Sequence, residues 1–206
     1  MNRYLPLICA VALSLIANTS FAESNSKPNI LFIAIDDLRP ALGCYGESEV
    51  ISPNIDKLAS RSVKFSRAYC SVPTCGASRA SVFTGLQPSA KRFVDYKTSI
   101  DQDAPDVPTL SQVFKEAGYT TLSLGKIFHH KYDAEKRSWS EKAWIPGNER
   151  LDANLDITLK RLTKAKRGLM FEAADVNDEE YIDGKTTLKT IQVLRRLKKD
   201  GKPFFL

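Results

Sequence analysis

The sequence predicts an α/β protein in which a mostly parallel sheet is flanked by helices. A nearly continuous apolar run over residues 29–35 is typical of a strand buried inside a parallel sheet. Helical and strand-like patterns then alternate along the chain, as in βαβ folds. The 206 residues, of which 43% are hydrophobic and 26% charged, suit one ordinary globular domain or a large piece of a bigger one.

The first half of the chain contains three predicted elements after this strand. Residues 52–59 predict a short helix, because a serine stands at the N-cap position, proline follows it and apolar residues recur at helical spacing. Residues 63–69 predict a short strand. Residues 77–83 predict a helix that ends at Gly85.

The second half repeats the alternation around a less regular stretch. Residues 108–118 predict an amphipathic helix that ends in glycine, and residues 119–124 predict the strand after it. Residues 131–183 show poor periodicity and predict a long irregular segment. A final helix is expected over residues 185–199, and the apolar residues 204–206 read as the opening of a strand.

The N-terminus has the pattern of a secretory signal peptide over residues 1–22. A short basic start precedes an apolar run, and small residues stand at the positions before a cleavage site after Ala22. The run is shorter than the ~20 residues that a membrane-spanning helix needs. We therefore expect export to the periplasm or secretion, without a stable membrane span; the alternatives are an uncleaved anchor or a lipoprotein that uses Cys9.

The chain carries a formal net charge of +6, and its basic residues gather at residues 160–167 and 195–199. A basic surface suits polyanions such as sulfated polysaccharide. Charge runs of this kind are more often solvated helix faces. No nucleic-acid-binding motif accompanies them, so no nucleic-acid partner is expected.

Three cysteines follow the signal peptide, namely Cys44, Cys70 and Cys75. An odd number leaves at least one unpaired in an oxidising compartment. If Cys44 and Cys70 pair or simply lie buried, the cysteine left over is Cys75.

The surroundings of Cys75 carry the most specific signal in the chain. Residues 70–85 read CSVPTCGASRASVFTG. This segment resembles the signature of the type I, formylglycine-dependent sulfatases, in which Cys-x-Pro-x-Arg, or less commonly Cys-x-Ala-x-Arg, precedes apolar residues and Thr-Gly. Cys75, Ala77 and Arg79 occupy the Cys-x-Ala-x-Arg positions. The resemblance implies that a separate maturation enzyme oxidises Cys75 to formylglycine.

The chemistry explains why such a site uses an aldehyde. A serine or cysteine that attacked a sulfate ester would remain sulfated, because the group is slow to displace. A hydrated aldehyde has one hydroxyl to attack sulfur and a second whose deprotonation expels sulfate. Cys75 is expected at a helix N-terminus, which favours an anion, with Arg79 on the same face. The alternative is a buried structural cysteine near a surface arginine.

Asp36 and Asp37 follow the first predicted strand, at the edge where ligand sites gather in open α/β sheets. Adjacent carboxylates repel unless a cation lies between them, and oxygen ligands select Ca²⁺ or Mg²⁺. Taken alone, the pair is more often a turn or a helix cap. The resemblance implies that Asp36, Asp37 and the formylglycine at residue 75 are metal ligands, for Ca²⁺ with Mg²⁺ possible.

Residues 125–130 read GKIFHH and are similar to a segment of the iduronate-2-sulfatase-like branch. The resemblance implies that Lys126 neutralises sulfate charge in the transition state, and that His129 hydrogen-bonds the formylglycine hydroxyl or moves its proton. His130 has no matching role. A His-His pair by itself is equally a surface feature or a metal ligand.

The resemblance covers residues 29–206 and implies the alkaline-phosphatase-like sulfatase fold, incomplete at the C-terminus, with a sulfated saccharide as substrate. Residues 23–206 are then expected to be the N-terminal part of a truncated catalytic domain, inactive alone, because the family's later metal and sulfate ligands are missing. Two alternatives remain open. One is a phosphodiesterase or phosphonate hydrolase of the alkaline-phosphatase superfamily, and the other is a non-catalytic exported fragment that binds glycans.

Overall fold

The computed structural model describes residues 27–146 and 175–206. The predicted signal peptide over residues 1–22 and the basic cluster over residues 160–167 lie outside these ranges. Within them, no helix combines the length and the apolar character that crossing a bilayer requires.

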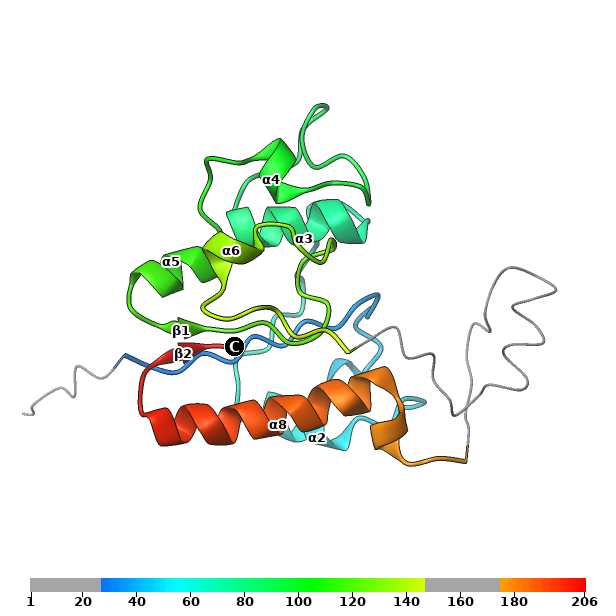
Figure 1. The fold of residues 1–206 in the computed structure, drawn as a ribbon. Coiled ribbons are helices and arrows are strands. Elements are labelled where there is room, and N and C mark those ends of the chain that lie inside the picture. Colours follow the sequence, from blue (N-terminus) through cyan, green and yellow to red (C-terminus); the bar gives the residue numbers. More distant parts are fainter. Residues whose placement is uncertain (1–26, 147–174) are drawn as a thin grey trace, which may run out of the picture.

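A small parallel sheet lies at the centre of the fold (Figure 1). Strand β1 (Thr120–Thr121) pairs in parallel with strand β2 (Phe204–Phe205), with Thr120 opposite Phe204. On the other edge of β2, the backbone of Ile30 forms a parallel bridge with Phe205. Segments from the start, middle and end of the chain therefore lie side by side, and the predicted parallel sheet is confirmed.

The apolar run over residues 29–35 joins the sheet only through its first half. The amide of Ile30 donates to the carbonyl of Phe204 at 2.8 Å, and the amide of Phe32 donates to the carbonyl of Leu206 at 2.7 Å. Farther along, Ile33 is 71% exposed. The prediction of a strand buried throughout is therefore wrong for the second half, because the described ladder stops at Phe32 and no described element covers Ile33.

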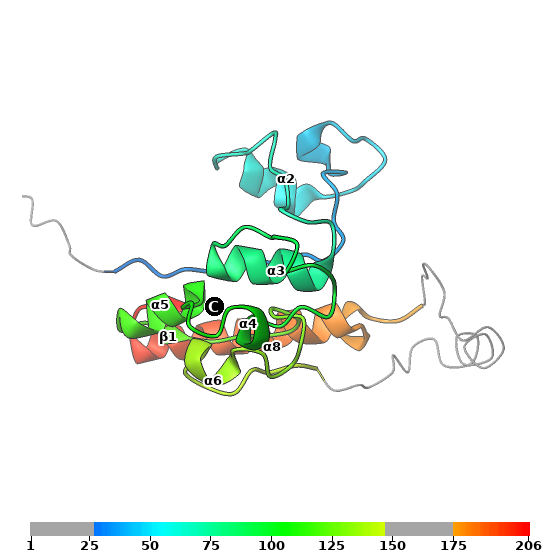
Figure 2. The same ribbon diagram turned by 90° about the horizontal axis from the view of Figure 1, so that it is seen from above.

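Helices cover both faces of the sheet, as the views in Figures 1 and 2 show. Phe204 belongs to a cluster with Val193 and Leu197 of helix α8 (Ile182–Asp200). Its neighbour Phe205 belongs to the larger cluster that contains helix α3 (Cys75–Thr84). Successive side chains of a strand point to opposite faces, so two adjacent phenylalanines connect the two helical layers to one strand.

The larger cluster is built mainly from aromatic rings. Phe83 of α3 meets Phe128 edge-on with ring centroids 5.0 Å apart, and Phe205 stacks on Phe114 at 4.9 Å. Trp139 lies within ring contact of Phe83 and Phe205. This packing fixes α3, and with it Cys75, against the sheet.

The four predicted helices are present with boundaries close to those expected. Helices α2 (Pro53–Ala59), α3, α5 (Leu110–Glu116) and α8 match them. Gly85 ends α3 with a φ of 69°, a left-handed conformation that glycine adopts without a Cβ penalty. The Thr109 side chain caps α5 by accepting from the amide of Gln112.

Several features differ from the prediction. Short helices α4 (Ile100–Asp103) and α6 (Glu135–Ser138), and the 3₁₀ turns η1 (Gly43–Tyr45) and η3 (Asp178–Glu180), carry too little periodicity to be predicted. The strand expected over residues 63–69 is wrong. Val63 is 82% exposed, and no described segment offers that stretch a ladder of backbone hydrogen bonds, which β-forming side chains alone do not replace.

Candidate functional site

Helix α3 begins at Cys75, as expected. Its N-cap residue, Thr74, has an extended backbone and makes no side-chain cap hydrogen bond. The first amides of the helix are therefore not satisfied by the cap, which leaves a terminus suited to an anion. Cys75 is a half-buried free thiol.

The start of α3 packs tightly against a second backbone segment. A Cβ added to Gly76 would lie 2.4 Å from the carbonyl oxygen of Tyr96. Because that neighbour is backbone, it cannot move aside as a flexible side chain would. The residue after Cys75 must therefore be glycine for Tyr96 to approach the helix this closely.

Arg79 joins α3 to two distant segments. Its Nη1 donates to the carbonyl oxygens of Lys126 at 2.6 Å and Ile127 at 2.8 Å. Its Nη2 lies 3.3 Å from Oδ1 of Asp36, and the side chain is only 12% exposed. The predicted catalytic residues Arg79 and Lys126 thus meet the predicted metal ligand Asp36.

Asp36 lies between two positive charges. Its Oδ2 accepts a hydrogen bond from Nζ of Lys126, while Oδ1 faces Arg79. The hydrogen bond from Lys126, followed by that from Arg79, lowers the pKa of Asp36 from its ordinary value, although partial burial opposes the shift. The carboxylate is therefore ionised at neutral pH. Asp37 is exposed and has a φ of 53°, in the left-handed region.

His129 lies in the same electrostatic environment. Burial lowers its pKa from the ordinary value of 6.5, and the charges of His130, Lys126 and Arg79 lower it further, whereas Asp36 opposes them. Its Nδ1 is buried and has no hydrogen-bond partner among the described residues. The imidazole is therefore neutral at pH 7 and has a nitrogen available.

Two residues near His129 were not identified from the sequence. The ring of Tyr96 meets the ring of His129 edge-on, with centroids 6.3 Å apart. Nε2 of His130 lies 3.1 Å from the carbonyl oxygen of Lys97. No residue pattern marks Tyr96 or Lys97, because only the folded chain brings them to the start of α3.

The candidate metal ligands among the described residues do not form a metal centre. Among residues 27–146 and 175–206, no group of three His, Cys, Asp or Glu side chains is placed to hold an ion. Both oxygens of Asp36 face Lys126 and Arg79. The oxygen chemistry of Asp36 and Asp37 suits Ca²⁺, but Ca²⁺ takes roughly 6–8 oxygen ligands, and this arrangement does not fit it. The metal-binding role of Asp36, Asp37 and Cys75 stays a prediction.

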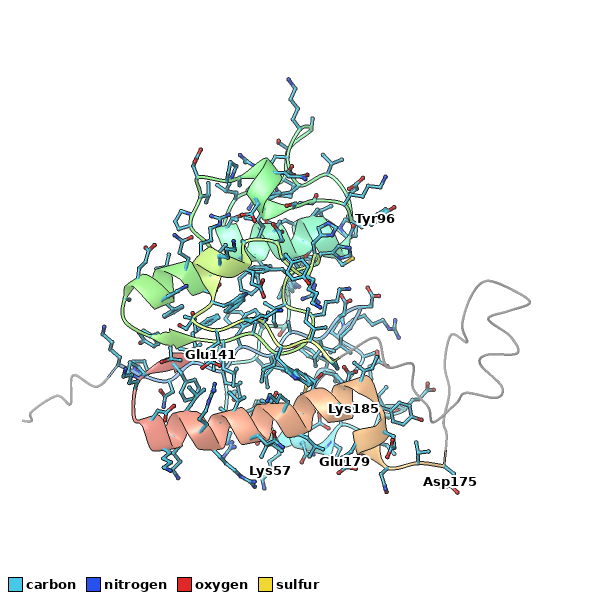
Figure 3. The ribbon with its side chains drawn as sticks, viewed as in Figure 1. Lys57, Tyr96, Glu141, Asp175, Glu179 and Lys185 are labelled. Carbon is cyan, nitrogen blue, oxygen red and sulfur yellow. The ribbon has the colours of Figure 1, made fainter. Side chains whose placement is uncertain are left out.

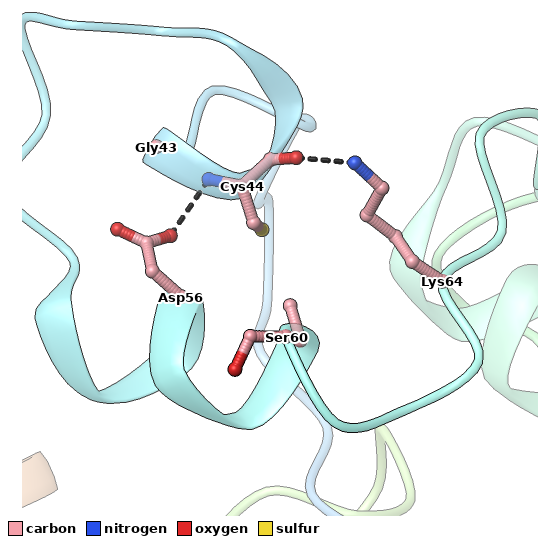
Figure 4. Close-up of a pocket in the computed structure, with 6 residues that line it drawn as sticks. Gly43, Cys44, Asp56, Ser60 and Lys64 are labelled. Carbon is pink, nitrogen blue, oxygen red and sulfur yellow. Dashed lines mark hydrogen bonds between the residues drawn. The ribbon is translucent and has the colours of Figure 1, made fainter.

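The other two cysteines lie elsewhere and are free thiols, with Cys70 exposed. Cys44 lines an open hollow of about 400 Å³ between η1 and α2 (Figure 4). There the Cys44 amide donates to Oδ1 of Asp56 at 2.7 Å, and Nζ of Lys64 donates to the Cys44 carbonyl. None of the predicted site residues lines this hollow.

Comparison with known proteins gives a family match and related sequences that agree with each other. The sequence model of the Sulfatase family matches residues 28–206. The chain is 38% identical over 201 residues to the iduronate 2-sulfatase of Mus musculus, an alignment that covers 93% of this chain. It is 34% identical over 215 residues to the iduronate 2-sulfatase of Homo sapiens, covering 97% of this chain.

These alignments cover a limited part of the relatives. The chain spans 36% of the length of the mouse protein and 38% of the human one. A sulfatase of Formosa agariphila is 35% identical over 138 residues, which are 63% of this chain and 27% of that protein.

Proposed function

The chain belongs to the sulfatase family, and from this premise we propose that the protein hydrolyses sulfate esters of sulfated saccharides, as an iduronate-2-sulfatase-like enzyme. The observation that carries the proposal is the position of Arg79. Four residues after Cys75 on α3, it bonds to Asp36 and to the backbone of Lys126. Predicted site residues from three separate segments therefore meet near the start of one helix.

Cys75 is the proposed nucleophile position. Its conversion to formylglycine by a maturation enzyme would supply the hydrated aldehyde that attacks sulfur and later releases sulfate. Three features of the chain support this assignment: the thiol is free, it is half-buried, and it is the first residue of α3. The positive end of the helix would favour a bound sulfate group.

Lys126 and Arg79 have different proposed roles. Lys126 is 44% exposed and bonds to Asp36 through a flexible side chain, so it is free to turn toward a sulfate oxygen and neutralise its charge. Arg79 is largely buried and held by two carbonyl groups and a carboxylate. We assign it to fixing the relative positions of α3, Asp36 and Lys126.

His129 is the proposed proton carrier. Its lowered pKa keeps the imidazole neutral, and its Nδ1 has no described partner. A neutral imidazole accepts a proton from the nucleophile's hydroxyl or donates a hydrogen bond to it. Burial of the ring and the positive charge of Lys126 and Arg79 both favour this neutral state.

Asp36 and Asp37 remain the proposed ligands of Ca²⁺, with Mg²⁺ as the alternative. In the described arrangement Asp36 is already neutralised by Lys126 and Arg79. Further oxygen ligands are needed to reach the usual coordination number.

The site of action is proposed from the N-terminal sequence. Residues 1–22 have the pattern of a signal peptide, which would deliver the protein to the periplasm or the extracellular medium. Sulfated saccharides of the extracellular space would be accessible there. The maturation enzyme would have to act on Cys75 before the helix that carries it becomes buried against the sheet.

The experiment combines mass spectrometry with a turnover assay. The protein, as its gene encodes it, is expressed in a host that contains the maturation enzyme. We expect an aldehyde at residue 75 and sulfate release from an aryl sulfate. Cys75→Ser should abolish turnover, because serine offers no second hydroxyl to expel sulfate, whereas the matched control Cys70→Ser should keep it.

Three results would contradict the proposal. Absence of the aldehyde at residue 75 would remove the proposed nucleophile. A higher kcat/KM on phosphodiesters than on sulfate esters would favour the phosphodiesterase alternative. Salt-sensitive retention on heparin without any turnover would favour a glycan-binding protein instead.

A further inference from the structure

Residues 95–98, which we call the strap, connect the two sides of the proposed site. The Tyr96 carbonyl packs against Gly76 at the start of α3, so closely that a Cβ there would lie 2.4 Å from it. The Tyr96 ring meets His129 edge-on, with centroids 6.3 Å apart. Figure 3 shows Tyr96 beside α3. The strap thus touches both the residue after Cys75 and the proposed proton carrier.

His130 fastens the strap to the segment that carries His129. Its Nε2 lies 3.1 Å from the Lys97 carbonyl oxygen. A carbonyl only accepts hydrogen bonds, so Nε2 must carry the hydrogen and donate it. Among the described residues, the strap's remaining hydrogen bonds are internal. The Lys97 amide donates to Oδ1 of Asp95 at 2.7 Å, and the Thr98 amide donates to the Asp95 carbonyl at 3.3 Å.

A second anchor follows the strap and does not involve the His130 side chain. Asp133 is buried and accepts hydrogen bonds from Oγ of Ser99 at 2.9 Å and from the Ile100 amide at 2.8 Å. This anchor holds the start of α4. Loss of the His130 bond should therefore release residues 95–98 locally while the rest of the fold stays in place.

We propose that His130 is a positioning residue of the sulfate-ester site: its bond to Lys97 holds Tyr96 between the start of α3 and His129. Tyr96 is 55% exposed, so a few contacts must hold its ring. With the strap fixed, the His129 ring is contacted edge-on by Tyr96 and also by His130, whose ring centroid lies 4.8 Å away. The reactive position of His129 relative to residue 75 then depends on His130. This inference rests on the proposed function.

The kinetic test compares His130→Ala with His130→Gln in the matured protein as its gene encodes it, with 4-nitrocatechol sulfate as the probe. Alanine removes the donor, whereas glutamine keeps an N–H group at a similar reach. We expect His130→Ala to lower kcat about 10-fold with little change in KM, because misplacing a catalytic group slows the chemical step. His130→Gln should retain most of the activity, and both variants should keep the melting temperature of the wild type.

A double-mutant cycle tests whether His130 acts through Tyr96. If it does, Tyr96→Ala should lower kcat to a similar extent, and adding His130→Ala to it should cause little further loss. Additive effects of the two substitutions would overturn the proposal. So would a His130→Gln variant that is as slow as His130→Ala.

Amide hydrogen exchange tests the proposal without turnover. In His130→Ala the amides of Lys97 and Thr98 should exchange at least about 10-fold faster, since the strap opens locally. The Asp103 amide, bonded to the Ser99 carbonyl at 2.9 Å, is the internal control and should be unchanged. A wild type that does not cleave sulfate esters would overturn the proposed function, and this exchange measurement would still decide the role of His130. Unchanged rates at Lys97 and Thr98 would overturn that role.

Discussion

The guanidinium of Arg79 and the carboxylate of Asp36 form an ion pair, with Nη2 3.3 Å from Oδ1. One partner lies on α3 and the other follows the first strand segment. The same guanidinium holds the backbone of Lys126 and Ile127. A single, largely buried side chain therefore joins the three segments that carry the proposed chemistry, and its replacement has clear expected effects.

Arg79→Lys should strongly lower both activity and stability, although the substitution keeps the positive charge. A lysine has one ammonium group and cannot reproduce the planar fork that serves two carbonyls and a carboxylate. We expect kcat/KM to fall about 100-fold or more, and the free energy of unfolding to fall by about 2 kcal/mol. Arg61→Lys, at an exposed arginine outside the site, is the matched control and should change neither quantity appreciably. Wild-type kinetics for Arg79→Lys would refute its positioning role.

Gly76→Ala should destabilise the protein although alanine favours helices. The added methyl group would lie 2.4 Å from the Tyr96 carbonyl oxygen, and relieving that clash requires backbone movement. A cost of about 1–3 kcal/mol is expected from overpacking of this kind. Urea unfolding measures it, with Ser78→Ala on the same helix as the control. Equal stabilities of the two variants would show that the strap moves freely.

The imidazole of His129 should titrate below its ordinary pKa of 6.5, mainly because it is partly buried. Since the folded-state pKa lies below the unfolded one, the neutral ring's contribution to stability is present above pH 6.5 and is lost as the pH falls through the folded value. NMR titration of the metal-free protein measures this shift. His130→Gln should raise the pKa of His129, because one neighbouring charge is removed; a shift in the opposite direction would contradict this origin.

Calcium should bind the 206-residue chain weakly. Asp36 is occupied by Lys126 and Arg79, and the described residues hold no group of three candidate ligands. We expect a dissociation constant of about 1 mM or above, at the weak end for protein calcium sites. Isothermal titration calorimetry on chelator-treated protein gives the value. Micromolar binding would show that the two cations release Asp36 readily.

The sequence predicts the fold best where local signals and burial agree. Helix α3 has a glycine stop and a face of small and aromatic residues, including Ala77 and Phe83, that packs into the core. The apolar residues of 29–35 and 63–69 carry local signals typical of strands, but neither segment forms a complete strand. Whether such a segment becomes a strand depends on a backbone partner from a distant part of the chain, which periodicity alone does not specify.

In the candidate site, too, the sequence predicts local features but not those that depend on distant segments. The motif around Cys75 predicts Arg79 on the same helix face, and the structure places Arg79 against Asp36 and Lys126. Tyr96 and the bond between His130 and Lys97 could not be predicted, because they depend on how loops cross at the start of α3. The metal-ligand assignment of Asp36 and Asp37 comes from resemblance, and in the structure Asp36 pairs with Lys126 and Arg79.

Because the first segment of the sheet pairs with residues 204–206, it cannot complete its pairing until late in synthesis. Ile30 and Phe32 take their backbone partners from Phe204 and Leu206, near the other end of the sequence. During synthesis at about 5–20 residues per second, the first segment waits on the order of 10 s before those partners leave the ribosome. Throughout that interval its apolar side chains and open edge are exposed to any chaperone or export factor that binds nascent chains.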